Sequence, residues 1–272
     1  AFARAAQENG ADITTGCAVI GIETSNGQVT GVITEKGLVR CRVVVCAAGA
    51  WSHKVARMAS ISLPYRVVRS TVAETTPTEV ITPLCFWTPE LSFRQRSNGS
   101  FYVASSARSD YDIDLEFFRD IRLFLPNFIK NRRLFRIRLG KELFRDLLRT
   151  LPWPSTIHQT LDEEPIPNYD SITATMKRFH ELFPFLDSVR VRRVWAGKID
   201  APPDAVPVMG EVSKPKGFIF ATGFSGHGFA MGPIVGRVIS ELILDGKPSV
   251  DLYPMRHSRF KDGDMDAPKV LF

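Results

Sequence analysis

The sequence predicts a mixed α/β fold in which two regions are threaded through each other. Near the C-terminus, an apolar run, a glycine-rich stretch and an amphipathic run follow one another, which indicates a strand, a loop and a helix. Near the N-terminus, runs rich in Val, Ile and Thr are separated by Asn26-Gly27 and Lys36-Gly37, which favours antiparallel strands. The composition changes after about residue 60, where a second region begins.

The first region is expected to comprise residues 1–60 and 197–272. It opens with a short helix that Gly10 closes, and an antiparallel meander follows whose last strand ends in a buried apolar run. The expected spans are 2–9 for the first helix, 12–23, 28–34 and 38–46 for the strands of the meander, a helix ending near residue 60, 218–221 for a late strand and 234–244 for the last helix.

The second region, residues 61–196, is expected to be built on an antiparallel sheet, because Asn98-Gly99 separates two strand-like runs. One of its helices should place Phe179, Leu182 and Phe183 on its apolar side. The expected spans are 66–74, 91–96, 100–104 and 189–195 for the strands, 170–183 for that helix, and 115–149 for helical structure interrupted near Pro126 and Gly140.

Composition places the chain among globular proteins, because 44% of its 272 residues are hydrophobic and 24% are charged. No apolar run approaches the ~20 residues of a membrane span. The N-terminus has no signal-peptide pattern and lacks an initiator Met, so the chain is expected to begin inside a longer protein. The four cysteines form no CxxC pair and have no histidine at zinc-finger spacing, so we expect no metal site, reduced thiols and a cytoplasmic location.

The net charge of +6 is concentrated in one segment. Residues 119–149 hold ten Lys or Arg and three Asp or Glu, a local surplus of seven, so the remainder is nearly neutral and nucleic-acid binding is not expected. Three interpretations of this basic segment stay open. They are helices with solvated charges, a docking surface for a partner subunit or an acidic electron acceptor, and peripheral contact with an anionic membrane.

The glycine-rich stretch from Gly223 to Pro233 is the strongest functional signal. Glycines let the backbone approach a flat ligand closely, and the start of the following helix offers unpaired N–H groups and positive potential. A reduced flavin gathers negative charge at one end of its ring and suits such a place. The alternative is an ordinary turn from strand to helix with no ligand.

The run Ser225-Gly226-His227-Gly228-Phe229 resembles the C-terminal flavin loop of the D-amino-acid oxidase-like family of FAD-dependent oxidoreductases. The preceding Trp195-Ala196-Gly197 and the run from Pro203 to Gly210 match as well, and the pattern is most similar to D-hydroxyproline dehydrogenase and sarcosine oxidase β-type subunits. The resemblance implies an FAD-binding Rossmann-like domain interleaved with a substrate domain. It also implies oxidation of a small amino acid, by hydride transfer to the flavin, to an imine that water hydrolyses.

The family's opening GxGxxG turn, which holds the dinucleotide pyrophosphate, is absent from this sequence. The Rossmann-like domain is therefore expected to be incomplete: either the sequence is truncated or a partner supplies the first half. On its own, the chain is expected to bind flavin weakly or not at all and to show no turnover. A non-catalytic remnant or interaction subunit with the same fold is the alternative.

The resemblance implies FAD contacts from residues 47–51, from residues 223–231 and from Val19. The small side chains of residues 47–50 leave room for the ligand, and His227 is expected either to hydrogen-bond a flavin oxygen or to brace the loop. The implied residues are Val19, then Ala47, Ala48, Gly49, Ala50 and Trp51, then Gly223, Phe224, Ser225, Gly226, His227, Gly228, Phe229, Ala230 and Met231.

The substrate site departs from the family pattern. Ala230 stands where monomeric sarcosine oxidases have a lysine, and Ile199 stands where glycine oxidases have an arginine. Arg94 and Tyr102, on the predicted hairpin, and Lys198, beside Ile199, are the remaining candidates for binding a substrate carboxylate. No general base is identified.

Overall fold

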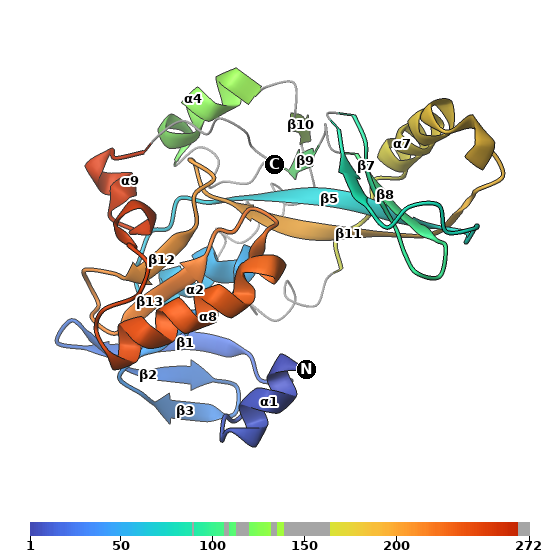
Figure 1. Cartoon of the computed structure of the whole chain (residues 1–272). Helices are drawn as coiled ribbons and strands as arrows, with labels where there is room; N and C mark the ends of the chain where they lie inside the picture. The colour runs from blue at the N-terminus through green and yellow to red at the C-terminus, as the bar shows by residue number, and fades with distance from the viewer. Residues whose placement is uncertain (89, 106–108, 113–119, 132–134, 139–163, 266–272) are drawn as a thin grey trace.

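The structure is a computed structural model that describes residues 1–88, 90–105, 109–112, 120–131, 135–138 and 164–265 (Figure 1). Its helices are α1 (Phe2–Glu8), α2 (Ser52–Met58), α4 (Ile121–Asn131), α7 (Tyr169–Leu182), α8 (Gly228–Leu244) and α9 (Arg259–Asp262), with short 3-10 turns at Gly49–Trp51, Pro184–Leu186 and Tyr253–Met255. Its strands are β1 (Val19–Ser25), β2 (Gln28–Thr34), β3 (Gly37–Arg40), β4 (Val44–Cys46), β5 (Arg66–Thr75), β6 (Cys85–Trp87), β7 (Ser92–Gln95), β8 (Phe101–Ala104), β9 (Ser109–Asp112), β10 (Phe135–Arg138), β11 (Val191–Ala201), β12 (Val208–Glu211) and β13 (Phe218–Thr222).

Strands β1, β2 and β3 form the predicted antiparallel meander, at the bottom of Figure 1. Asn26 and Gly27 both have positive φ, which is the backbone that a tight hairpin turn requires. The first strand is shorter than predicted, because residues 12–18 lie outside any strand. Helix α1 lies where the sequence predicted it, and Gly10 follows it with φ +89°.

The prediction that the third strand of the meander continues to residue 46 is wrong. The chain leaves the meander after β3, and β4 pairs in parallel with β13 in a separate sheet of order β12-β13-β4. Gly217 makes this crossing feasible, because a Cβ there would lie 2.1 Å from the carbonyl oxygen of Arg42. Strand β4 is also only half-buried, because Val45 is 39% exposed.

The largest sheet has the order β10-β9-β5-β8-β7-β6, and β11 pairs with β5 along ten residues of register. These two long strands run side by side across the molecule (Figure 1). The hairpin of β7 and β8 around Asn98-Gly99 confirms the prediction. Helix α7 covers this part of the sheet with Phe179, whose ring packs against those of Phe93 and Phe101.

Two helix predictions in this region need correction. Helix α4 continues through Pro126, and residues 135–138 form strand β10 beside β9. Leu182 lies 42% exposed at the end of α7, so only its neighbours Phe179 and Phe183 pack on the core. Residues 139–149, including Gly140, lie outside the described residues.

Helix α8 begins at Gly228, six residues before the predicted start, so half of the predicted loop is helical. Its Val235, Val238 and Ile239 pack on β13. All four cysteines are free thiols, of which Cys46 is buried. In the part of the chain that the structure describes, no helix has both the length and the apolar character needed to cross a membrane. The division at residues 61 and 197 remains a prediction.

Candidate functional site

A pocket of about 500 Å³ lies where the ends of β4, β11 and β13 meet helix α8. It is lined by Val45, Ala47, Gly49, Lys198, Ile199, Asp200, Ala221, Phe224, Gly226, Gly228, Gly232, Val235, Gly236 and Ile239. The arrangement of the sheet explains the pocket. Alternate residues of β13 belong to two apolar clusters. Phe218 and Phe220 pack in the first cluster, on one face of the sheet, and Ile219 and Ala221 pack in the second, on the other face. Helix α8 belongs to the second cluster, whereas Val45 of the neighbouring β4 stays exposed at the pocket.

The two segments that the sequence singled out meet at this pocket, although more than 170 residues separate them. Ala47 and Gly49 contribute from the end of β4, and Phe224, Gly226 and Gly228 contribute from the glycine loop and the start of α8. The other predicted cofactor residues adjoin these positions without lining the pocket, and Val19 lies half-buried in β1 beside the first apolar cluster.

Glycines give the pocket open walls. A Cβ built at Gly49, Gly232 or Gly236 would have no atom within 4 Å, and one at Gly226 would meet only Ile199, at 3.8 Å. The backbone here is therefore bare toward a space that a flat ligand can fill. Gly232 and Gly236 were not among the predicted site residues. With Gly228 they recur every four residues, which places all three on one helix face and is the signal that identifies them.

Asp200 holds the start of the glycine loop. Its buried carboxylate accepts hydrogen bonds from the amide of Gly223 at 2.7 Å and the hydroxyl of Thr222 at 3.3 Å, and its carbonyl accepts one from the amide of Ser225 at 3.1 Å. Asp200 also lines the pocket, so one residue joins β11 to the loop. The sequence did not single out this role, because the partners of Asp200 lie more than 20 residues further along the chain.

A second network fixes Gly49. The Tyr65 hydroxyl donates to the Gly49 carbonyl, and the hydroxyls of Ser52 and Thr222 are hydrogen-bonded to each other, 2.7 Å apart. Burial, reinforced by the nearby Asp200 carboxylate, raises the pKa of Tyr65 well above its usual range, so the phenol stays a neutral donor. The two segments that line the pocket are thus linked by side chains buried behind it.

The glycine loop presents polar groups as well as space. Ser225 has a φ of +49°, and its Oγ is buried without a hydrogen-bond partner among the described residues. His227 lies exposed at the N-terminus of α8, and its Nδ1 is 3.3 Å from the carbonyl oxygen of Phe224. This contact agrees with a bracing role. The first amides of α8 point out of the helix start and have no partner within the helix.

Of the three substrate candidates, only Lys198 lies at the pocket. Its Nζ is 5.6 Å from the centroid of the Trp51 ring, a cation–π contact. Tyr102 packs edge-on against Trp195, with centroids 5.2 Å apart, and Arg94 is exposed on the same hairpin. The hairpin pair is therefore not part of this pocket.

Comparison with known proteins settles the family. Residues 1–242 match the model of the FAD dependent oxidoreductase family, which is most of the chain. The chain belongs to this family. Relatives include hydrogen cyanide synthase subunit HcnC of Pseudomonas aeruginosa, 22% identical over 96% of this chain, and sarcosine oxidase subunit beta of Rhizobium meliloti, 26% identical over 96% of this chain. In both cases the match covers 51% of the relative, so the chain spans about half the length of these relatives.

Solved structures show the same fold. L-amino acid deaminase from Proteus vulgaris superposes with a TM-score of 0.85 at 23% identity, over 95% of this chain and 61% of that protein. The mixed α/β fold with antiparallel sheets, predicted from the sequence, is thus confirmed, and so is the resemblance to the D-amino-acid oxidase-like family.

Proposed function

We propose that this chain contributes the C-terminal part of the FAD site in a flavin-dependent oxidoreductase that acts on an amino acid. The observation that carries the proposal is the shared pocket of residues 47–49 and 224–228. Its glycine walls suit a flat ring. The family membership supports FAD as that ligand.

The proposed roles follow from position. The backbone from Gly223 to Met231 and the segment from Ala47 to Trp51 would contact the flavin, with Val19 toward its adenine end. The N-terminus of α8 would favour negative charge on the ring. The flavin, when bound, supplies the capacity to accept a hydride from the substrate carbon that carries the amine. The protein's part is to orient that carbon and to exclude water.

Lys198 is proposed as the group that pairs with the substrate carboxylate. It is the one described lysine or arginine that lines the pocket, and Trp51 beneath it limits where its ammonium group can lie. A secondary or primary amino acid such as sarcosine, glycine or hydroxyproline is the proposed substrate class. Arg94 and Tyr102 would act only if the substrate reached the β7–β8 hairpin.

The site is proposed to be completed by a further segment that carries the pyrophosphate-binding turn, either in a longer form of this chain or in a partner. Strand β4 is an edge of its three-stranded sheet, Val45 on it is 39% exposed, and Val43, just before it, is 40% exposed. Such a strand can accept a parallel neighbour. The relatives named above are themselves described as subunits. A partner or an electron acceptor is proposed to dock on the basic segment 119–149, of which residues 119, 132–134 and 139–149 lie outside the described residues.

Flavin titration tests the proposal. The purified chain and the complete gene product that carries it are each titrated with FAD, with flavin fluorescence and visible absorbance as readouts. The complete product is expected to bind FAD in a 1:1 ratio and the chain alone much more weakly. Anaerobic addition of sarcosine, glycine, hydroxyproline and both enantiomers of several amino acids should then bleach the visible band for at least one of them.

The alternative proposal is a non-catalytic remnant that kept the fold, which the absence of a cation at positions 199 and 230 favours. In that case the complete product binds FAD weakly and no amino acid bleaches it. Stoichiometric FAD binding by the chain alone would contradict the proposal that a further segment completes the site.

A further inference from the structure

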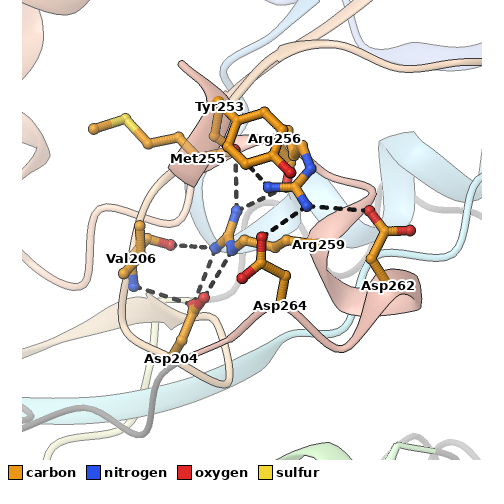
Figure 2. Close-up of polar contacts among 8 residues, drawn as sticks. All are labelled: Asp204, Val206, Tyr253, Met255, Arg256, Arg259, Asp262 and Asp264. Atoms are coloured by element: carbon orange, nitrogen blue, oxygen red, sulfur yellow. Dashed lines mark hydrogen bonds and ion pairs between the residues drawn. The ribbon is translucent and has the colours of Figure 1, made fainter. Parts of the chain in front are cut away.

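Arg259 is a fully buried cation. Its side chain is 1% exposed, and it pairs with Asp204, which is 3% exposed (Figure 2). The pair is bidentate: Nε lies 2.7 Å from Oδ2, and Nη2 lies 3.0 Å from Oδ1. This geometry joins α9, near the end of the described chain, to the turn that follows β11.

Every N–H of this guanidinium has a partner. Nη1 donates to the carbonyls of Met255 at 2.9 Å and Arg256 at 3.1 Å, and Nη2 also donates to the carbonyl of Val206 at 2.7 Å. Oδ1 of Asp204 in turn accepts the amide of Val206 at 3.2 Å. We call this group of five residues the Arg259 clasp. Because a guanidinium has five donors in a fixed plane, the clasp admits one arrangement of the turn.

The turn that the clasp holds lies against the glycine loop. Ala205 adopts φ +57° and its amide donates to the carbonyl of Pro202 at 3.1 Å. The Pro202 ring lies so close to Gly223 that a Cβ there would be 2.6 Å from Pro202 Cγ. Two residues before Pro202, Asp200 accepts hydrogen bonds from the amides of Gly223 and Ser225. The position of the turn therefore sets the position of the loop.

We propose that Arg259 is a positioning residue for the glycine loop: it fixes the turn at 202–206 and thereby holds residues 223–225 at the pocket. The loop geometry does not depend on a ligand, whereas the consequence for FAD rests on the proposed function. The described residues after α8, 245–265, form the C-terminal tail that carries Arg259. This tail thus helps to position the site, although none of its described residues lines the pocket.

Arg256 provides a matched control. It lies in the same tail and is also paired, but its partners are Asp262, at 3.2 Å, and Asp264, at 2.9 Å, and its guanidinium stacks 3.8 Å from the Tyr253 ring centroid (Figure 2). All of these partners belong to the tail itself. A lysine at either position keeps the charge and loses the planar fork, so the two variants differ in the destination of the contacts and in burial, because the Arg256 side chain is 20% exposed and that of Arg259 is 1% exposed.

The test is hydrogen exchange of the purified chain, followed by mass spectrometry of peptides that cover 222–227. Arg259→Lys is expected to raise exchange of the Gly223 and Ser225 amides at least ~10-fold and to leave the β1–β3 meander unchanged. Arg256→Lys is expected to change the same amides less than ~2-fold. Equal exchange in Arg259→Lys and wild type, or an equal rise in both variants, would overturn the proposal.

A second variant covers the case in which Arg259→Lys does not fold. The double change Asp204→Asn with Arg259→Met replaces the buried ion pair by uncharged groups of similar volume, so that no unpaired charge is left buried. The carbonyls of Met255, Arg256 and Val206 lose their donor, so the thermal midpoint is expected to fall, while the chain still folds and the loop amides exchange faster. Wild-type exchange in a folded double variant refutes the positioning role.

Flavin titration of the complete gene product separates the two proposals. A ~10-fold weaker FAD affinity in Arg259→Lys, with faster loop exchange, supports both. Faster exchange with unchanged FAD affinity supports the clasp and contradicts flavin contact by this loop. Unchanged exchange overturns the clasp whatever happens to FAD.

Discussion

Replacing Gly236 by alanine should stabilise the protein and weaken its cofactor site at once. Gly236 lies within α8, where alanine is favoured over glycine by ~1 kcal/mol because the glycine backbone loses more freedom on folding. Nothing lies within 4 Å of the position its Cβ would take, so the added methyl meets no part of the described chain. The free energy of unfolding should therefore rise by up to ~1 kcal/mol.

The same methyl would project into the pocket that Gly236 lines. An extra carbon in a well-packed contact costs ~1–3 kcal/mol, which corresponds to a dissociation constant for FAD raised by ~5- to ~150-fold. Urea unfolding measures the first effect in the purified chain, and FAD fluorescence titration of the complete gene product measures the second.

Ser240→Ala is the control for this prediction, because Ser240 lies one turn further along α8 and does not line the pocket. It should leave FAD binding unchanged. A Gly236→Ala protein that gains stability and still binds FAD like the wild type would refute the placement of the ligand over this helix face. A protein that loses stability would refute the openness of the space above Gly236.

Three further predictions concern single side chains. Asp200→Ala leaves the buried Gly223 amide without its acceptor and should cost ~1–3 kcal/mol in urea unfolding; a change below ~0.5 kcal/mol would show that the bond is dispensable. Lys198→Met keeps the aliphatic stem beside Trp51 and removes the charge, so steady-state kinetics should show a raised KM for the amino acid with an unchanged FAD affinity, and an unchanged KM would remove Lys198 from the substrate site. Burial lowers the pKa of His257, so the unfolded chain takes up its proton first and stability should fall as the pH drops below ~6.5 and through the folded pKa. His257→Gln should flatten that part of a stability–pH curve measured by thermal unfolding, and an unaltered curve would assign the effect to other groups.

Local sequence signals predicted the parts of the fold that depend on local chemistry. Asn26-Gly27 and Asn98-Gly99 both mark hairpins in the structure. The parallel pairing of β4 with β13 could not be predicted, because the two strands lie more than 170 residues apart in the sequence and a local meander also accounted for the residues of β4. Strand β10 carries an alternation of Phe, Arg, Ile and Arg, a period of two that a helical interpretation of residues 115–149 overlooked.

The parts of the candidate site that are formed by glycines and other small residues could be predicted from the sequence. The glycines of the loop and the small residues after β4 were found because few side chains leave such space. The helical start at Gly228 was missed because glycines and Pro233 are weak helix formers, and packing of Val235, Val238 and Ile239 on β13 outweighs that preference. Asp200 and Arg259 were missed because their roles depend on partners distant in sequence.

Strand β4 gives the strongest reason to expect a completed site. The run Val43, Val44, Val45, Cys46, which ends in β4, has no polar alternation, and this is typical of a strand that is buried on both faces. In this structure one face is covered by the first apolar cluster, and Val45 on the other lines the pocket. Exposed valines beside glycine walls offer water no hydrogen bonds, so covering them with an apolar ring or a neighbouring strand is favourable. The same face therefore favours binding of the flavin and docking of the segment that would hold its other half.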